Sequence, residues 1–355
     1  MRSIEKAWYQ RAGWLILLLP LSYLFRALAA VRRRYHAAVA RAHPAPVPVV
    51  VVGNISVGGT GKTPLIIGLG RALQKAGLKP GIISRGYLGK APHYPFSVNS
   101  DSSVDETGDE ALLIARMLDC PMVVDPDRVQ ALEKICSDFH CDVVLSDDGM
   151  QHYALPRDME IVVVDGERLF GNGMCLPAGP LREPVSRLQA VAHVVVNGQT
   201  DRDKLPPELQ HASSMRLQPT YLVSMESGEK KPFRGAPFNI GTTIHAVTGI
   251  GNPDRFFNVL ATLPYTVERH DFPDHHPFTE EDLAALDIDP RHPVVMTEKD
   301  AVKCEQFAGP NFWYLAVEVD LSEGLMARLV EEIQQLVAQR KQRADQTHEL
   351  GQSSR

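Results

Sequence analysis

The sequence is poor in cysteine and lacks an excess of positive charge. Its five cysteines are odd in number and form no Cys-x-x-Cys pair (Cys120, Cys136, Cys141, Cys175 and Cys304). This pattern excludes a disulfide framework and a zinc finger, so we expect reduced thiols. The net charge of −6 over 355 residues excludes a general nucleic-acid binder, and we expect no nucleic-acid partner. The composition, 44% hydrophobic and 23% charged, is that of a globular protein.

A long hydrophobic run is also missing. The longest uncharged stretch near the amino terminus, residues 12–25, has the sequence AGWLILLLPLSYLF and lies between Arg11 and Arg26. As a helix it would cover about 21 Å, short of the roughly 30 Å hydrocarbon core of a bilayer. Pro20 further weakens a continuous span. The stretch therefore predicts a helix that lies in the membrane interface.

The charge distribution supports that prediction. Residues 1–43 hold eight basic side chains and one acid, so a charge of +7 stands against −13 in the remainder. The triplet Arg32–Arg34 could bind anionic lipid. A buried core helix and a cleaved signal peptide with Ala27-Leu28-Ala29 as its small-x-small site remain alternatives. Arg26 and the arginine triplet argue against export.

The rest of the chain predicts an α/β fold. Short apolar runs such as Val49–Val52 and Val143–Leu145 alternate with helical patterns such as Pro64–Ala76. Continuous apolar strands separated by helices indicate a mostly parallel sheet with helices on both faces, as in P-loop NTPases. We expect a smaller second α/β lobe. The predicted units are an interface helix (1–43), a nucleotide-binding domain (44–170), a linker or substrate loop (171–190), the second domain (191–339) and a flexible tail (340–355).

The clearest motif follows the first predicted strand. Its glycines allow backbone N–H groups to face phosphate oxygens, and the helix that follows directs its positive end at the same point. The lysine can reach the β- and γ-phosphates of a nucleotide, and the last threonine can bind Mg²⁺. A strict P-loop has glycine where this chain has serine. The predicted phosphate-binding residues are Ser56, Val57, Gly58, Gly59, Thr60, Gly61, Lys62 and Thr63.

A second motif supplies paired acids after another apolar strand. Asp147 and Asp148 follow Val143–Leu145 and precede Gly149. Beside a P-loop, such carboxylates predict a Mg²⁺ site, although alone they could merely cap a helix. Membrane-positioning ATPases with a deviant P-loop carry a lysine where this chain has Val57. This difference favours a phosphotransferase over a membrane-associated P-loop ATPase that positions or regulates partners, which stays the alternative.

Two segments are candidates for the acceptor side. Asp109 and Glu110 lie where a helix is predicted to begin, which is also what ordinary helix capping predicts. The segment His270–His276 contains three histidines and two aspartates. A catalytic or substrate-binding loop, a metal site and plain surface all remain open for it.

Several motifs together resemble the tetraacyldisaccharide 4′-kinase family of lipid A synthesis. Met150 is a small departure, because an aromatic residue or leucine is expected there. The resemblance is carried by SVGGTGKTP (56–64), SRGY (84–87), GDE (108–110), DDGMQH (147–152), LPAGPLREP (176–184), VTGIGNPDRF (247–256), FPDH (272–275) and TEKDAVK (297–303).

The resemblance implies a reaction and roles for particular residues. The γ-phosphoryl of ATP would pass to the 4′-hydroxyl of an acylated glucosamine disaccharide 1-phosphate, forming lipid IVA. The resemblance implies that Asp109 is the general base and that His275 is paired with it. If the two residues meet, the two lobes must close over the nucleotide. Arg182 resembles a charge stabiliser at the phosphoryl group. Thr63, Glu110 and Asp147 or Asp148 would hold Mg²⁺. We expect a monomer, peripheral or monotopic on the cytoplasmic face of the inner membrane in Gram-negative bacteria.

Overall fold

One continuous sheet of 13 strands organises the computed structural model, which describes residues 3–42, 44–198, 202–235 and 237–353. The strand order is β11-β10-β12-β13-β8-β7-β6-β1-β5-β2-β4-β3, with β9 beside β8. The strands are β1 (Val49–Gly53), β2 (Pro80–Ser84), β3 (Phe96–Val98), β4 (Met122–Val124), β5 (Val143–Asp147), β6 (Met159–Asp165), β7 (His193–Asn197), β8 (Ser213–Ser224), β9 (Lys230–Pro232), β10 (Thr243–Thr248), β11 (Thr266–Asp271), β12 (Val294–Thr297) and β13 (Phe312–Leu321).

The sheet is mostly parallel, as the apolar runs predicted. From β4 through β2, β5, β1, β6 and β7 to β8, every neighbouring pair is parallel. The long strands β8 and β13 then pair antiparallel, and β13, β12, β10 and β11 continue in parallel. The strand β7 pairs with β6, although the sequence assigned residues 191–339 to a second unit. The sheet thus passes without a break across that predicted boundary, which stays a prediction.

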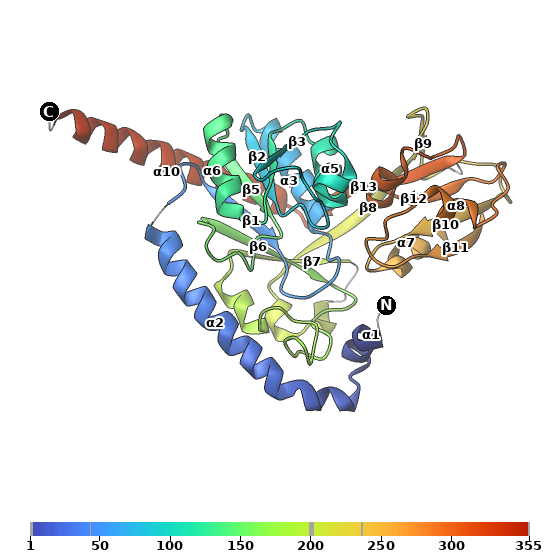
Figure 1. Ribbon diagram of the computed structural model, residues 1–355, viewed down its shortest axis with the longest axis horizontal. Coiled ribbons are helices and arrows are strands. Elements are labelled where there is room, and N and C mark those ends of the chain that lie inside the picture. Colours follow the sequence, from blue (N-terminus) through green and yellow to red (C-terminus); the bar gives the residue numbers. More distant parts are fainter. Residues whose placement is uncertain (1–2, 43, 199–201, 236, 354–355) are drawn as a thin grey trace.

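Helices cover both faces of the sheet (Figure 1). Val50 and Val52 of β1 pack in one apolar core with α3, α5 and α10, whereas Val49 and Val51 pack in another with α6. Burial on both faces explains why β1 is an unbroken run of valines. The α-helices are α1 (Ser3–Gln10), α2 (Leu19–Ala42), α3 (Lys62–Lys75), α4 (Val104–Thr107), α5 (Asp109–Met117), α6 (Arg128–Asp138), α7 (Pro253–Leu260), α8 (Glu280–Ala284), α9 (Glu298–Cys304) and α10 (Leu325–Ser353).

The carboxyl-terminal segment is helical further than predicted. The structure continues α10 to Ser353, where the sequence predicted a flexible tail from Arg340. The Arg340 guanidinium donates to the carbonyl oxygen of Ala45 at 2.7 Å and to Asp158 at 2.5 Å. Lys341 donates to Asp142 at 2.9 Å. These contacts hold the helix against the body of the protein at the start of the predicted tail.

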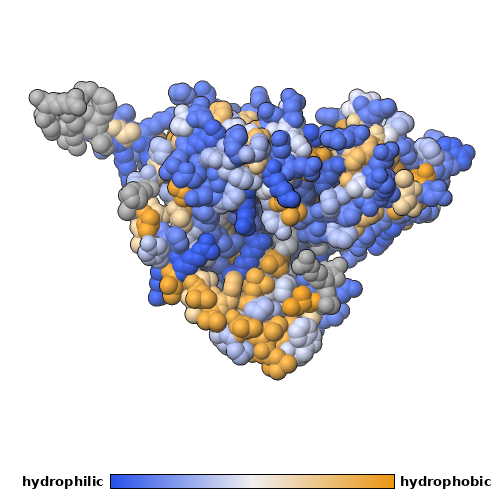
Figure 2. Space-filling model, viewed as in Figure 1, coloured by the Kyte–Doolittle hydropathy of each residue, from blue (hydrophilic) through white to orange (hydrophobic). Residues whose placement is uncertain are grey.

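The amino-terminal segment forms α1, a 3₁₀ helix (Gly13–Leu18) and α2. Helix α2 runs along the outside of the body, and Figure 2 shows an apolar surface over this region. Its exposed apolar side chains include Leu21, Leu24 and Leu28. A buried core helix is therefore not what the structure contains. Within the described ranges, the helical stretch Gly13–Ala40 has the length and apolar character to cross a membrane.

Candidate active site

The phosphate loop connects β1 to α3. Gly58 and Gly61 have φ angles of 101° and 94°, which favour glycine. A Cβ atom on Gly61 would lie 2.3 Å from the side-chain nitrogen of Asn197. That nitrogen donates to the carbonyl oxygen of Thr60 at 2.9 Å. Asn197, at the end of β7, therefore holds the loop in shape, and the sequence motifs did not indicate it.

The loop lysine faces the paired acids. Lys62 is buried, and its Nζ lies 3.5 Å from Oδ1 of Asp148. The other oxygen of Asp148 accepts a hydrogen bond from Arg182 at 3.0 Å. Asp147, the last residue of β5, is 1% exposed and accepts a hydrogen bond from Ser84 at 3.2 Å. Parallel strands end at one edge of the sheet, which is why Ser84 at the end of β2 meets Asp147 at the end of β5, 63 positions later.

Asp147 and Asp148 occupy opposite electrostatic environments. Burial, together with the negative charge of Glu110, raises the pKa of Asp147 to about 7. Burial acts on Asp148 in the same direction, but Lys62 and Arg182 outweigh it and hold its pKa well below the usual value. The second oxygen of Asp147, Oδ1, is buried without a hydrogen-bond partner among the described residues. This arrangement leaves a buried acceptor that a cation would satisfy.

A second group lies at the amino terminus of α5. Asp109 is buried, and Nδ1 of His275 donates to its carboxylate at 3.0 Å. Lys299 donates to Nε2 of His275 at 3.3 Å and to Glu110 at 2.9 Å. The acceptor beside Nδ1 and the donor beside Nε2 together favour the His275 tautomer with its proton on Nδ1. The predicted partners Asp109 and His275 are thus in contact, 166 positions apart in the chain.

Two lysines of α9 complete this group. The Nζ atoms of Lys299 and Lys303 lie 3.9 and 4.0 Å from Oδ2 of Asp109. Burial opposes ionisation, but the hydrogen bond from His275 and the charge of Lys299 lower the pKa of Asp109. The pKa of Glu110 is also lowered, because the charges of Lys299 and Lys62 outweigh its burial. Both acids are therefore ionised at neutral pH.

The two groups form one site, since Lys62 and Asp147 both interact electrostatically with Glu110. A comparison with protein families bears on what the site does. A family model described as "Tetraacyldisaccharide-1-P 4'-kinase" matches residues 14–334. This chain belongs to that family.

Relatives and a solved structure agree with this assignment. A tetraacyldisaccharide 4'-kinase from Nitrosococcus oceani is 47% identical over 333 residues, 94% of each chain. One from Pseudomonas fluorescens is 46% identical over 323 residues, 91% of this chain and 93% of the relative. The crystal structure of an "apo" form of LpxK from Aquifex aeolicus in complex with ATP is 26% identical, with a TM-score of 0.70, and the match covers 91% of this chain and 99% of that one.

In this member of the 4′-kinase family, a cavity of about 360 Å³ lies beside Arg182. Its lining includes Arg26 and Arg33 of α2 on one side and Arg182 with Glu183 on the other. Glu183 is buried and accepts hydrogen bonds from Gln151 at 2.8 Å and from Arg187 at 3.2 Å. The cavity borders the exposed helix α2 and also Arg182, whose guanidinium contacts Asp148. The sequence did not indicate Glu183 as a site residue.

The structure brings the predicted residues together without testing their roles. Lys62, Asp148 and Arg182 form one contact network, Asp109 with His275 another, and Glu110 and Asp147 lie between them. Thr63 is buried at the first turn of α3. On Gly59 a Cβ atom would meet no described heavy atom within 4 Å, so this part of the loop is open. Carboxylate and hydroxyl oxygens are the ligands that Mg²⁺ prefers, and the unpartnered Oδ1 of Asp147 fits that use.

Proposed function

We propose that this chain transfers the γ-phosphoryl group of ATP to the 4′-hydroxyl of a tetraacyldisaccharide 1-phosphate. One observation carries the proposal: the P-loop lysine and the Asp109–His275 pair lie at the same cluster of acidic residues. The names of the curated relatives and the ATP complex of the Aquifex aeolicus relative support it. The product would be lipid IVA.

The phosphate loop would bind the nucleotide. Its backbone N–H groups would bind phosphate oxygens, and Lys62 would exchange its contact with Asp148 for the β- and γ-phosphates. Oxygen atoms of Thr63, Glu110, Asp147 and Asp148 would hold Mg²⁺. When bound, the ion supplies positive charge at the phosphate oxygens.

Asp109 would accept the proton of the acceptor hydroxyl. The hydroxyl oxygen forms a bond to the γ-phosphorus, the bond to the ADP oxygen breaks, and the proton passes to an oxygen of Asp109. A carboxylate with a lowered pKa is a weak base, but phosphoryl transfer through a loose transition state depends mainly on positioning. His275 would orient Asp109 through its Nδ1 hydrogen bond.

Arg182 would stabilise charge on the phosphoryl group or on a substrate phosphate. Its guanidinium already contacts Asp148, and it borders the cavity next to α2. A planar guanidinium matches the geometry of phosphate oxygens. The same cavity is the expected place for the headgroup of the lipid acceptor, because apolar residues of α2 lie outside it.

Helix α2 would lie in the membrane interface. Its exposed leucines face away from the body, while Ser22 anchors the opposite side through hydrogen bonds with Cys175 and Ala178 at 2.8 and 3.0 Å. Exposed apolar surface of this extent favours contact with lipid. We therefore propose a peripheral or monotopic protein on the cytoplasmic face of the inner membrane, acting as a monomer.

The test is phosphoryl transfer to defined acceptors. The full chain is incubated with γ-labelled ATP, Mg²⁺ and either the acylated disaccharide 1-phosphate or its acyl-free counterpart, and the label is followed into product. Label in the acylated acceptor, lost in the Asp109→Ala variant, supports the proposal. Release of labelled phosphate without a lipid product would indicate an ATPase, and equal use of the acyl-free acceptor would indicate a soluble sugar kinase.

A further inference from the structure

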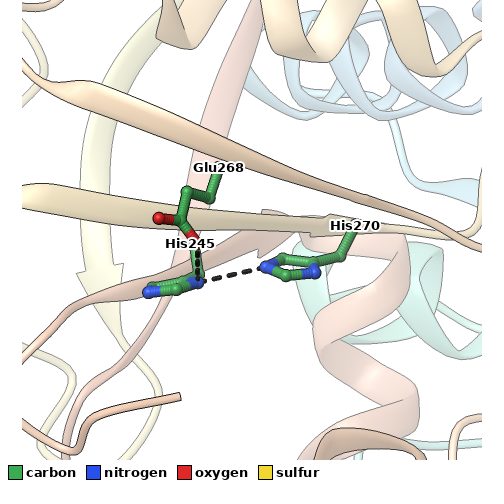
Figure 3. A group of neighbouring side chains, drawn as sticks. All are labelled: His245, Glu268 and His270. Atoms are coloured by element: carbon green, nitrogen blue, oxygen red, sulfur yellow. Dashed lines mark hydrogen bonds and ion pairs between the residues drawn. The ribbon is translucent and has the colours of Figure 1, made fainter. Parts of the chain in front are cut away.

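A group of histidines lies on the opposite part of the sheet from the phosphate loop. His245 in the middle of β10 is register partner of Glu268 in β11, and His270 follows two positions later on the same face of β11. The three side chains converge in Figure 3. None of the three is a proposed catalytic residue, and none takes part in the contacts described for the reaction site.

The distances between the potential ligand atoms are those of a metal site. Nδ1 of His245 lies 3.1 Å from Nε2 of His270 and 3.4 Å from Oε2 of Glu268, and the three atoms all lie within 4.8 Å of one another. Zinc bonds to nitrogen and oxygen are about 2.0–2.2 Å long, so tetrahedral ligand atoms lie roughly 3.3–3.6 Å apart. The observed spacing needs only small side-chain adjustments to meet this geometry.

The surroundings favour the neutral imidazoles that bind metals. His292 stacks on His245 with ring centroids 5.6 Å apart, and the rings of His245 and His270 are also stacked at 5.3 Å. Burial lowers the pKa of both His245 and His270, and the neighbouring imidazoles lower that of His245 further. Glu268 is exposed, so one side of the group is open to solvent for an entering ion or a further ligand.

We propose that His245, Glu268 and His270 form a binding site for a divalent transition-metal ion, zinc being the ion we test. Two imidazoles and a carboxylate are a zinc ligand set, with a fourth position left for water. The ion would join β10 to β11, the edge strand of the sheet. Because β11 ends at Asp271, four residues before His275, the ion would also stabilise the strand that leads to the partner of Asp109.

The first experiment is a titration of the tag-free full chain with Co²⁺, a spectroscopic substitute for zinc. The protein is first stripped with a chelator and then kept in excess Mg²⁺, which occupies oxygen-ligand sites. We expect one equivalent of Co²⁺ to bind with the visible absorption of a nitrogen- and oxygen-ligated ion, and one equivalent of Zn²⁺ to displace it. Absence of a saturable visible spectrum would overturn the proposal.

Variants locate the ion. His270→Gln and Glu268→Gln each remove one ligand at positions that are not fully buried, so the fold should persist. His193→Gln is the matched control, because His193 pairs with a single carboxylate, Glu332 at 2.7 Å, in another part of the sheet. We expect His270→Gln to weaken binding by more than the roughly 10–100-fold typical of losing an outer-shell partner. Glu268→Gln should weaken it less, and the control should bind like the parent.

Thermal unfolding supplies a second measurement that does not depend on activity. An ion that binds only the folded chain raises the unfolding midpoint. Zinc should therefore raise the midpoint of the parent and of His193→Gln, but not that of His270→Gln. Equal zinc stabilisation of the parent and His270→Gln would place the ion elsewhere and overturn the proposal. Circular dichroism without metal confirms that the compared variants are folded.

Discussion

The amino-terminal helices expose apolar side chains to solvent, whereas the phosphate site buries charged ones. Along the amino-terminal helices, leucines are exposed, with Leu17 at 78% exposure. At the phosphate site, Lys62, Asp109 and Asp147 are buried. Exposed apolar surface and buried charge both cost free energy in an isolated soluble chain. Each arrangement is what we expect of a surface that another molecule completes, lipid in the first case and a nucleotide with its cation in the second.

The buried charges differ from the exposed leucines in how they are compensated. The acids of the site lie against Lys62, Lys299, Lys303 and Arg182, so most of their charge is balanced within the protein. The exposed leucines of the amino-terminal helices have no such compensation among the described residues. Substitutions at the site should therefore lower the rate of phosphoryl transfer, whereas substitutions of the exposed leucines should weaken binding to lipid.

The largest effect is expected for Asp109→Ala. Loss of the proton acceptor should lower kcat by roughly 10²–10⁴-fold and leave ATP affinity nearly unchanged. Steady-state kinetics and nucleotide-binding titrations measure the two quantities. Asp105→Ala, an exposed acid on the preceding helix, is the control and should retain activity. If Asp109→Ala lost ATP binding instead, the residue would be a metal ligand and the assignment as base would fail.

Arg182→Ala should produce the next largest effect. Removing one guanidinium that stabilises developing charge should lower kcat/KM by roughly 10²-fold. The control is Arg291→Ala, since Arg291 is highly exposed and pairs with Asp289, at 2.5 Å. Unchanged kcat/KM in Arg182→Ala would remove Arg182 from the site. Equal losses in both variants would point to a general effect of lost positive charge.

Leu17→Ser tests whether the exposed leucines of the amino-terminal helices bind lipid. Burial of a leucine in an apolar phase contributes about 1.5–3 kcal/mol, so its loss should weaken partition into vesicles by about tenfold or more. Flotation with vesicles that contain anionic lipid measures the bound fraction. Ile240→Ser is the matched control, because Ile240 is equally exposed at 80% but lies in the loop before β10. Equal binding of the two variants would reject the exposed apolar surface of the amino-terminal helices, to which Leu17 belongs in the 3₁₀ helix Gly13–Leu18, as the anchor. Soluble activity on a short-chain acceptor should not change in either.

The strands of the sheet could be predicted from the sequence more fully than the residues that hold the phosphate loop and Asp109 in place. The run Val49–Val52 could be identified as a strand because both its faces are buried, which leaves an unbroken apolar pattern. The phosphate loop was equally clear, since its glycines are required by its backbone. The extent of α10 was underestimated, because a polar segment gives no apolar periodicity although Arg340 and Lys341 form specific contacts.

No role was predicted for Lys299, Lys303 or Asn197, although both lysines lie in TEKDAVK (297–303), one of the segments that carry the family resemblance. They act through contacts between elements distant in the chain, which no local pattern encodes. One signal was available for the lysines: Thr297 caps α9 by accepting from the backbone N–H of Asp300, and positions 299 and 303 are one turn apart on that helix. Both lysines therefore point to the same partner, Asp109. The hinge closure inferred from the separation of Asp109 and His275 stays a prediction, because the structure has them in contact.

The smallest effect is expected at Glu298, a half-buried residue outside the reaction site whose Oε1 atom is buried. Its Oε1 lacks a hydrogen-bond partner in the described part of the chain, and burial raises its pKa to about 7. A group with a raised folded-state pKa contributes stability below its unfolded pKa of about 4.5 and loses it as the pH rises through 7. Glu298→Gln should therefore match the parent near pH 4, gain on it as the pH rises, and be more stable by about 1–2 kcal/mol at pH 8. Denaturant unfolding across this range measures the difference. A constant difference between Glu298→Gln and the parent at all pH values would mean that the substitution changes packing and that the ionisation of Glu298 does not affect the free energy of unfolding.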